Sequence, residues 1–145
     1  MVQIRAFPSS RPAPLRARAV ASVPYDVVDT GEARALAAGN PESFLHVCRP
    51  EIDLPEGTPL YSEPVYAKGR ENLDRFEADG TLVPDPVPRL LVYRQTWRGA
   101  SQDGLVAACS VDDYDSDAIR KHEKTRKDKE DDRTKHLLVQ SAHAE

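Results

Sequence analysis

Apolar and polar residues alternate along several short stretches of this chain, and a two-residue period is typical of β-strands. Residues 2–7 alternate in this way and predict a half-buried first strand. The apolar run at residues 43–48 predicts a second strand. Residues 89–97 and 105–111 flank a polar stretch at residues 98–104, which predicts an antiparallel hairpin with a polar turn.

Two other segments space their apolar residues with the period of a helix. Residues 32–38 predict a short helix that Asp29 or Thr30 can cap, with Gly39 as its left-handed stop. Residues 63–78 predict a longer helix. Its apolar face is formed by Tyr66, Leu73 and Phe76.

The order of the predicted elements indicates the fold class. All twelve prolines precede residue 89, so the first half of the chain is predicted to be rich in loops. The order of strand, helix, strand, helix, hairpin and helix predicts an α+β fold with a small, largely antiparallel sheet and two or three helices. A length of 145 residues predicts a single domain that spans residues 1–145.

A run of sixteen residues at 121–136 contains no apolar side chain. Residues 120–136 hold eight Lys or Arg and five Asp or Glu, so this segment has a net charge of about +3. The whole chain, in contrast, has a net charge of −4. The run predicts a helix that continues through residues 137–139. A solvated helix with internal ion pairs is one interpretation. The other is a site for a compact anion such as a nucleotide or pyrophosphate, because positive charge is concentrated there.

The start of this run holds the candidates for catalysis. Phosphoryl transfer requires cations around the phosphate and a carboxylate that orients the acceptor hydroxyl. Glu123 is the predicted acceptor-orienting base, and His122 is predicted to bind phosphate or to orient Glu123; Lys121 is a candidate phosphate ligand. The alternatives are a glutamate that stabilises the first helical turn and a solvated imidazole.

Further candidates follow in the same helix. Thr125 is predicted to be its N-cap, with Asp128 at the spacing of a capping box, which would leave free backbone amides for an anion. Arg126, Glu130 and Arg133 are predicted to form either a phosphate-binding cluster or an ion-paired one.

Two more candidates lie in a turn near the start of the chain. Pro24 fixes the turn that carries Tyr25 and Asp26, so both side chains are predicted to be held for substrate binding. The alternative for Asp26 is an Asx turn or a helix cap. On the strand predicted at residues 43–48, His46 is expected to pack in the core rather than to act as a ligand. The sequence has no glycine-rich phosphate loop, no zinc-ligand spacing and no serine nucleophile motif, and no metal ligand is assigned.

Cysteine usage, hydropathy and charge limit the class of protein. Cys48 and Cys109 lie in apolar runs, so both are predicted to be core residues without a disulfide. The sequence shows neither a secretory leader nor an apolar run of membrane length, which favours a soluble cytoplasmic protein. A net charge of −4 argues against nucleic acid as a partner.

Several segments in a fixed order carry a resemblance that covers nearly the whole chain. They are residues 23–28 (VPYDVV), 40–51 (NPESFLHVCRPE), 93–95 (YRQ) and 121–133 (KHEKTRKDKEDDR). With these motifs the chain resembles the prokaryotic domain-of-unknown-function family numbered one-zero-one-five. Val23 and Lys127 stand where the family usually has proline. The family's downstream Asp-Gly-His-His-Arg motif is not in this sequence, so the chain resembles the N-terminal portion of a longer family fold.

The resemblance implies a fold and an activity. The missing motif is similar to that of free-serine kinases of the ParB/sulfiredoxin fold, which implies a ParB-like domain, here incomplete. It also implies a small-molecule phosphotransferase with free serine as the leading acceptor, and with ATP, ADP or pyrophosphate as donor, together with Mg²⁺. The portion alone is expected to be inactive and to form homo-oligomers through exposed apolar surface. The alternative is a non-catalytic nucleotide- or anion-binding regulatory module of ParB-like fold.

Overall fold

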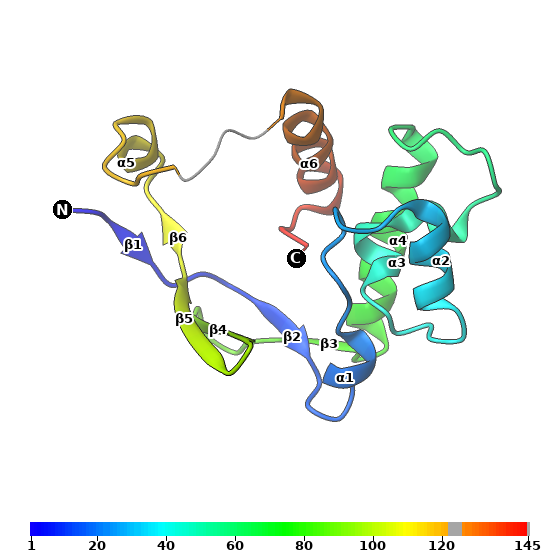
Figure 1. Cartoon of the computed structure of the whole chain (residues 1–145), viewed down its shortest axis with the longest axis horizontal. Coiled ribbons are helices and arrows are strands. Elements are labelled where there is room, and N and C mark those ends of the chain that lie inside the picture. The colour runs from blue at the N-terminus through cyan, green and yellow to red at the C-terminus, as the bar shows by residue number, and fades with distance from the viewer. Residues whose placement is uncertain (122–125, 145) are drawn as a thin grey trace. The chain divides into compact units, whose positions relative to one another are not determined.

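The structure, a computed structural model, describes residues 1–121 and 126–144 (Figure 1). The described helices and strands are mixed, which confirms the predicted α+β class. In chain order they are β1 (Ile4–Arg5), β2 (Ser10–Pro12), α1 (Ala17–Val20), α2 (Thr30–Ala37), α3 (Leu45–Cys48), the 3-10 helix η1 (Pro50–Asp53), α4 (Glu63–Ala78), β3 (Leu82–Pro84), β4 (Leu91–Trp97), β5 (Ala100–Val106), β6 (Ala108–Cys109), α5 (Val111–Asp115) and α6 (Lys127–Gln140).

The chain divides into two compact units. Unit 1 comprises residues 1–11 and 84–124, and unit 2 comprises residues 12–83 and 125–145. The described strands form three two-stranded sheets, in which β1 pairs with β6, β2 with β3, and β4 with β5. Among the described helices, none combines the length and apolar character that a bilayer crossing requires.

Unit 2 contains the hydrophobic core, which consists of two clusters of buried side chains. One cluster is formed by Val20, Val47, Leu73, Phe76 and Leu82. The other is formed by Ala33, Ala37, Leu45, Cys48 and Ile52. The helix α4 supplies Leu73 and Phe76 from the face that its apolar spacing predicts, and its bounds match the predicted residues 63–78. The core therefore forms where the helical pattern of the sequence is strongest.

The predicted helix cap of α2 is confirmed. Asp29 Oδ1 accepts a hydrogen bond from the Glu32 amide at 2.8 Å, and Glu32 Oε2 accepts one from the Asp29 amide at 2.9 Å. This reciprocal capping box fixes the start of the helix. Gly39 follows the helix with a φ of 73°, the left-handed conformation that glycine adopts without steric cost.

The predicted strand at residues 43–48 is wrong, because Leu45–Cys48 form the helical turn α3. This turn directs Leu45, Val47 and Cys48 into the two core clusters, which a strand with alternating faces would not do. His46 therefore does not pack in the core as predicted. Its Nδ1 lies 2.8 Å from Asp53 Oδ1, and its Nε2 lies 3.1 Å from the Asn40 carbonyl oxygen.

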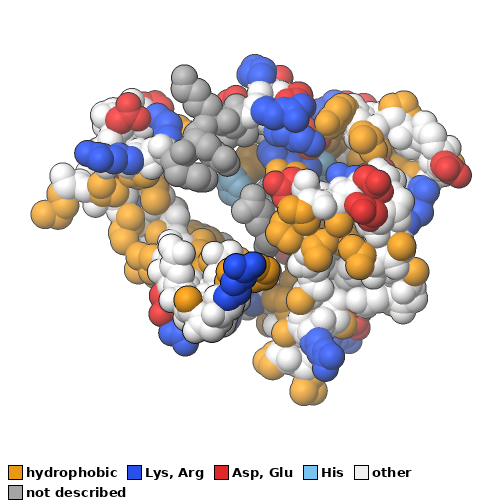
Figure 2. Space-filling view, in the orientation of Figure 1, with side chains coloured by type: hydrophobic (Ala, Val, Ile, Leu, Met, Phe, Trp, Pro, Cys, Tyr) orange, Lys and Arg blue, Asp and Glu red, His pale blue; other side chains and the backbone are white. Residues whose placement is uncertain are grey.

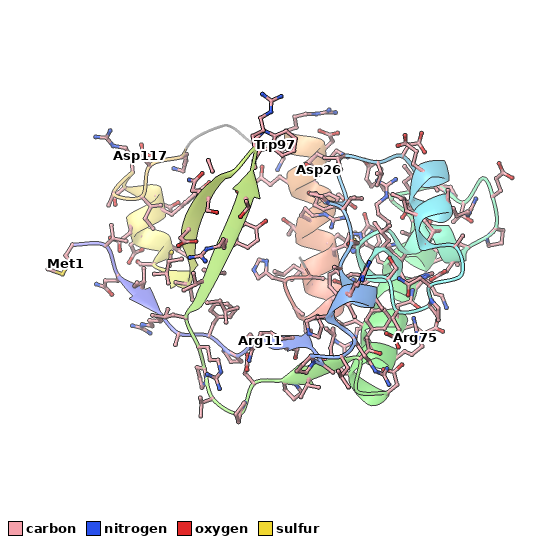
Figure 3. All side chains as sticks on the ribbon, turned by 60° about the horizontal axis from the view of Figure 1, so that its bottom comes forward. Met1, Arg11, Asp26, Arg75, Trp97 and Asp117 are labelled. Carbon is pink, nitrogen blue, oxygen red and sulfur yellow. The ribbon has the colours of Figure 1, made fainter. Side chains whose placement is uncertain are left out.

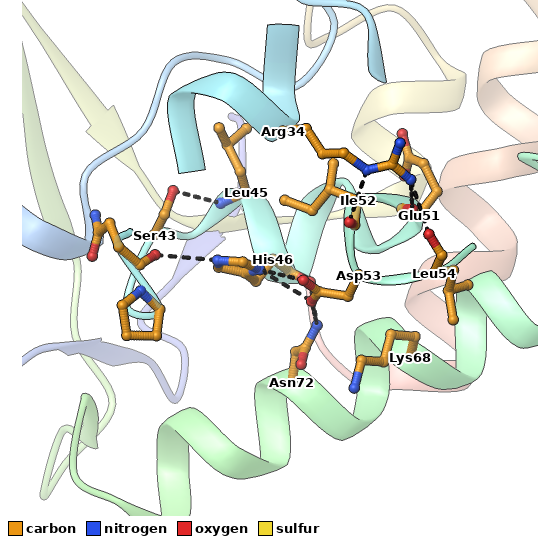
Figure 4. A network of polar contacts seen from close by, with 12 residues as sticks. Arg34, Ser43, Leu45, His46, Glu51, Ile52, Asp53, Leu54, Lys68 and Asn72 are labelled. Carbon is orange, nitrogen blue, oxygen red and sulfur yellow. Dashed lines mark hydrogen bonds and ion pairs between the residues drawn. The ribbon is translucent and has the colours of Figure 1, made fainter. Parts of the chain in front are cut away.

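Asp53 belongs to a polar network that joins α3, η1 and α4 (Figure 4). Asn72 of α4 donates from Nδ2 to Asp53 Oδ2 at 2.8 Å and to the His46 carbonyl at 2.7 Å. Arg34 of α2 donates to three carbonyls in and directly after η1, those of Glu51, Ile52 and Leu54. These bonds satisfy backbone groups of the short helical segments and hold them against α2 and α4.

Unit 1 is built around the β4–β5 hairpin, in which Leu91 pairs with Val106 and Trp97 with Ala100. Its turn is only Arg98 and Gly99, with φ of 49° and 80°, the left-handed pair that matches the twist of a hairpin. The predicted seven-residue turn at 98–104 is therefore wrong, since residues 100–104 belong to β5. Hydrophobic side chains lie at the surface along β5 and β6 (Figure 2).

Two other predictions for unit 1 are wrong because they expected buried residues that are exposed. The first strand is limited to Ile4–Arg5, and both Val2 and Ile4 are exposed rather than half-buried. Cys109 is exposed in β6, whereas Cys48 is buried in unit 2; both are free thiols. Polar contacts stabilise this part of unit 1: Asp85 accepts hydrogen bonds from Ser9 Oγ at 2.7 Å and Arg11 Nε at 2.9 Å.

Candidate anion-binding site

A pocket in unit 2 is lined by side chains from α3, η1, α4, α6 and two loops. The helix α6 contributes Lys129, Asp132, Arg133 and His136. These positions follow the i, i+3, i+4, i+7 spacing that places residues on one face of a helix. The sequence of the charged run therefore brings two cations, a carboxylate and an imidazole to one pocket, although none of these residues is apolar.

Asp132 is the centre of the contacts on this face, and only 8% of it is exposed. Its Oδ1 accepts a hydrogen bond from the Tyr66 hydroxyl of α4 at 3.0 Å. Its Oδ2 accepts from Arg133 Nη2 at 2.8 Å and from Arg133 Nε at 3.2 Å. Hydrogen bonds to both oxygens offset part of the cost of burying this carboxylate.

Two neighbours of Asp132 have shifted proton affinities. Burial, and then the hydrogen bond to Asp132, raise the pKa of Tyr66 to about 12, so its hydroxyl keeps its proton and acts as a donor. Burial and the charge of Arg133 lower the pKa of His136 to about 4, although Asp132 acts in the opposite direction. His136 is therefore a neutral imidazole near pH 7. Its ring packs edge-on against Tyr66, with centroids 4.9 Å apart.

Arg133 is held on two sides. Its guanidinium carbon lies 4.1 Å from the centre of the Tyr25 ring, in the turn that also carries Asp26 (Figure 3). Asp132 binds Nε and Nη2 along one edge of the guanidinium. No described residue accepts a hydrogen bond from its Nη1. Arg133 therefore keeps a donor edge for a ligand while its position is fixed by protein contacts.

The other two cations of the pocket differ in their pairing. Arg49 Nε lies 2.8 Å from Glu51 Oε1, and Arg49 Nη2 donates to Thr30 Oγ1 at 3.2 Å. Lys129 forms no ion pair with any residue in the described part of the chain. Among the residues that the structure describes, both carboxylates that line the pocket, Glu51 and Asp132, are therefore paired, whereas Lys129 has no ion-pair partner.

The pocket contains a thiol but no reactive nucleophile that the structure describes. Burial raises the pKa of Cys48 to about 11, so the thiol stays protonated at neutral pH and is a poor nucleophile. Within residues 1–121 and 126–144, no three His, Cys, Asp or Glu side chains converge as metal ligands would. The Mg²⁺ expected from the resemblance stays a prediction.

Some predicted site residues line the pocket, others are described by the structure but do not line it, and others lie outside the described residues. Tyr25 and Arg133 line the pocket and contact each other, so the structure brings together two residues that lie far apart in the sequence. Asp26 is in the same turn but is exposed. The predicted catalytic pair, Glu123 and His122, lies outside the described residues.

The remaining predicted residues do not line the pocket. Arg126 binds Asp128 at 2.7 Å on an exposed surface, and Glu130 is exposed. Figure 2 shows Lys and Arg side chains together over the start of α6. Lys121 belongs to unit 1, where its ammonium donates to the Tyr114 carbonyl at 2.9 Å and to Asp117 at 3.1 Å.

The predicted cap of α6 is also revised. The N-cap residue is Arg126, and it forms no side-chain cap hydrogen bond. The helix thus begins one residue later than a Thr125 cap requires, and Thr125 itself lies outside the described residues. The continuation of the helix through residues 137–139 is confirmed.

Sequence reasoning missed Arg49, Glu51, Tyr66, Asp132 and His136 as pocket or supporting residues. Asp132 and His136 could have been found, because they share the helical face of Lys129 and Arg133 in the charged run. Arg49 and Glu51 could not, since only the packing of α3, η1 and α6 against α4 places them there.

Comparisons with known proteins give one match. No curated protein and no solved structure matches the chain. The model of the family described as "Protein of unknown function (DUF1015)" matches residues 4–145. This match covers almost the full sequence and agrees with the motifs at residues 23–28, 40–51, 93–95 and 121–133. The chain is a member of the DUF1015 family.

Proposed function

We propose that the unit 2 pocket binds the phosphate group of a small molecule and forms the phosphate-binding part of a small-molecule phosphotransferase site. The donor would be a nucleotide or pyrophosphate, and the acceptor a hydroxyl, with free serine as the leading candidate. The observation that carries this proposal is the group of three cations, Arg49, Lys129 and Arg133, around one pocket in which Lys129 has no described ion-pair partner.

The pairing of charges indicates that the ligand is an anion. Glu51 and Asp132 are already bound to arginines, so the described lining residues offer no unpaired carboxylate to a cationic group. Lys129 and the Nη1 group of Arg133 remain available as charged donors. Phosphoryl-transfer sites require such donors around the phosphate oxygens, and charge-assisted hydrogen bonds are among the stronger ones in proteins.

The acceptor side of the proposal rests on residues outside the described ranges. We propose Glu123 as the base that orients the acceptor hydroxyl, with His122 beside it and Mg²⁺ on the donor phosphates. In a family member that also carries the downstream Asp-Gly-His-His-Arg motif, the substitution equivalent to Glu123→Gln should lower turnover by roughly 10²–10⁴-fold, because the general base is lost. A phosphoserine assay with ATP, ADP and pyrophosphate as donors measures this, and donor binding should remain unchanged.

The test of the pocket itself is a titration of the protein with pyrophosphate, ADP and ATP by calorimetry. Lys129→Ala should weaken pyrophosphate binding by about 10–100-fold, the usual range for losing a hydrogen bond to a charged group. Lys127→Ala is the matched control, because Lys127 lies on the same helix but pairs with Asp131 at 2.9 Å. Equal losses in both variants would show non-specific attraction, and no binding by the wild-type protein at millimolar pyrophosphate would contradict the proposal.

A second candidate function is a non-catalytic anion-binding or regulatory module of ParB-like fold. It is favoured by the chemistry of the described pocket residues, which can bind an anion but are poor bases and nucleophiles. Cys48 is a protonated thiol, Glu51 and Asp132 pair with arginines, and the pKa of His136 is lowered to about 4, which makes its imidazole a weak base. This module would bind pyrophosphate or nucleotides through Lys129 but transfer no phosphate to serine, and its binding would be unaffected by Glu123→Gln.

A further inference from the structure

A continuous chain of contacts joins α4 to the anion pocket. It runs from the Tyr66 hydroxyl to Asp132 Oδ1 at 3.0 Å, and from Asp132 Oδ2 to Arg133 Nη2 at 2.8 Å. It ends where the Arg133 guanidinium lies 4.1 Å from the centre of the Tyr25 ring. Tyr66 is only 2% exposed, so its hydroxyl acts from beneath the site rather than from the surface that a ligand reaches.

The two oxygens of Asp132 have separate partners, and this division fixes the carboxylate. The hydrogen bond from Tyr66 to Oδ1 prevents the carboxylate plane from rotating about χ2, a torsion that otherwise has a broad energy minimum. The fixed Oδ2 then binds Nε and Nη2 of Arg133, which sets the plane of the guanidinium. The Tyr25 ring covers one face of that plane. The Nη1 group is the part that remains for a ligand.

His136 helps to fix the Asp132 carboxylate, because its uncharged imidazole ring packs beside that group. Its Nε2 lies 3.8 Å from Asp132 Oδ1, beyond a normal hydrogen bond, and its buried Nδ1 has no hydrogen-bond partner among the described residues. The imidazole therefore packs beside the carboxylate without taking Oδ1 away from Tyr66. Tyr66 is the one described residue that donates to that oxygen.

We infer that Tyr66 is a positioning residue of the anion pocket, which acts through Asp132 to hold Arg133 so that its free Nη1 edge can bind a phosphate oxygen. This inference rests on the proposed function of the pocket. Its physical basis is preorganisation: a long arginine side chain that is already ordered loses less conformational freedom when it binds a ligand. Tyr66 itself is not expected to touch the ligand.

The experiment measures pyrophosphate binding to the full chain by calorimetry. Tyr66→Phe removes the hydroxyl and keeps the buried ring, and it should weaken binding by about 5-fold, the usual effect of one lost hydrogen bond. In an Arg133→Lys background, Tyr66→Phe should have no further effect, because the side chain that it positions has been replaced. Leu73→Val controls for lost stability in unit 2, and it should leave the dissociation constant unchanged.

A second readout does not depend on a ligand. In ¹⁵N NMR spectra, the Nε–H signal of Arg133 should be protected from exchange in the wild-type protein and should broaden or shift in Tyr66→Phe, but not in Leu73→Val. An unchanged signal would overturn the inference. If the wild-type protein binds pyrophosphate and Tyr66→Phe binds it equally well, only the inference fails; if the wild-type protein binds none, the proposed function fails and the inference with it.

Discussion

Every buried residue that the structure describes lies in unit 2, whereas the described residues of unit 1 are exposed or half-buried. Unit 1 is held by the β4–β5 ladder and by polar contacts such as Arg94 with Asp103 at 2.6 Å and Ser9 with Asp85 at 2.7 Å. Unit 2 is held by two apolar clusters, and three of its buried polar residues, Glu51, Asp132 and His136, line the pocket. The candidate site is therefore built on the unit in which side chains are ordered by packing.

This difference between the units follows from the placement of apolar residues in the helices of unit 2 and in the β4–β5 hairpin of unit 1. The helices α2 and α4 each present one apolar face, so they can pack together with α3 around a core. The hairpin carries large apolar residues on both faces, including Val92, Trp97 and Leu105, and all three are exposed. A two-stranded hairpin with no covered face has little burial to stabilise it.

The largest expected effect is the loss of stability when a core side chain of unit 2 is truncated, compared with the truncation of an exposed side chain in the hairpin of unit 1. Phe76 is 0% exposed, so Phe76→Ala should lower the free energy of unfolding of unit 2 by about 3–5 kcal/mol, since it removes buried surface and leaves a cavity. Trp97→Ala in the hairpin removes a larger ring, but Trp97 is 74% exposed, and the change should stay within about 0.5 kcal/mol. Urea unfolding measures both; similar losses would contradict the comparison.

A pH series should weaken the two units in different ranges. The unfolded chain protonates His136 as pH falls through its usual value of 6.5, whereas the folded chain does so only near 4. Unit 2 should therefore lose stability between these values, by on the order of 2–3 kcal/mol. In unit 1, the Arg11 and Ser9 hydrogen bonds lower the pKa of Asp85 from 3.8 to about 2, so its contribution is lost only as pH falls through that lower range.

Urea unfolding at several pH values, monitored by amide signals of each unit, measures this order. His136→Gln should flatten the slope of unit 2 between pH 6.5 and 4. The exposed His143 is the matched control, and His143→Gln should leave the slope unchanged. A slope that survives in His136→Gln would assign the acid sensitivity of unit 2 to other groups.

The smallest expected effect concerns the close approach of two helices in unit 2. A Cβ added to Gly69 of α4 would lie 2.8 Å from Gln140 Nε2 and 3.3 Å from the Val47 carbonyl oxygen. Overpacking usually costs about 1–3 kcal/mol, and alanine's higher helix propensity offsets up to about 1 kcal/mol, so Gly69→Ala should destabilise by roughly 1–2 kcal/mol.

The matched control is Gly104→Ala in unit 1, where the nearest atom would be the Tyr93 carbonyl oxygen at 3.8 Å, an ordinary contact. Thermal unfolding of both variants is the measurement. A neutral Gly69→Ala would show that α6 can shift on α4 without cost, which would weaken the argument that the pocket is rigidly supported.

Local signals in the sequence predicted the parts of the fold that depend on local interactions. The helix at residues 63–78 was predicted correctly, and Asp29 is one of the two caps predicted for α2, because amphipathic spacing and helix caps act within one segment. The run at residues 43–48 was misassigned, since a short apolar run fits a buried strand or a buried helical turn equally well. Only the two clusters that it joins decide between them.

In the hairpin and in the site, the residues that sequence reasoning missed are placed by contacts with segments elsewhere in the chain. Polar residues such as Ser101 and Asp103 looked like a turn, but pairing with Thr96 and Arg94 across the ladder makes them part of β5. For the site, the charged run left open a solvated, ion-paired helix and an anion site, and Arg133 was one of its candidate phosphate ligands. The residues that hold Arg133 in place could not be assigned from its neighbours in sequence, because Tyr66 lies 66 positions away from Asp132.

The discontinuous composition of unit 2 has a consequence for how the protein is made. Residues 12–83 emerge from the ribosome first, and α6 follows only after residues 84–124 of unit 1. At roughly 5–20 residues per second, translation of that intervening segment takes about 2–8 s. During this interval Tyr66 has no Asp132 to bind, and the face of α4 that α6 later covers is open to chaperones. The anion pocket is thus a late product of biogenesis.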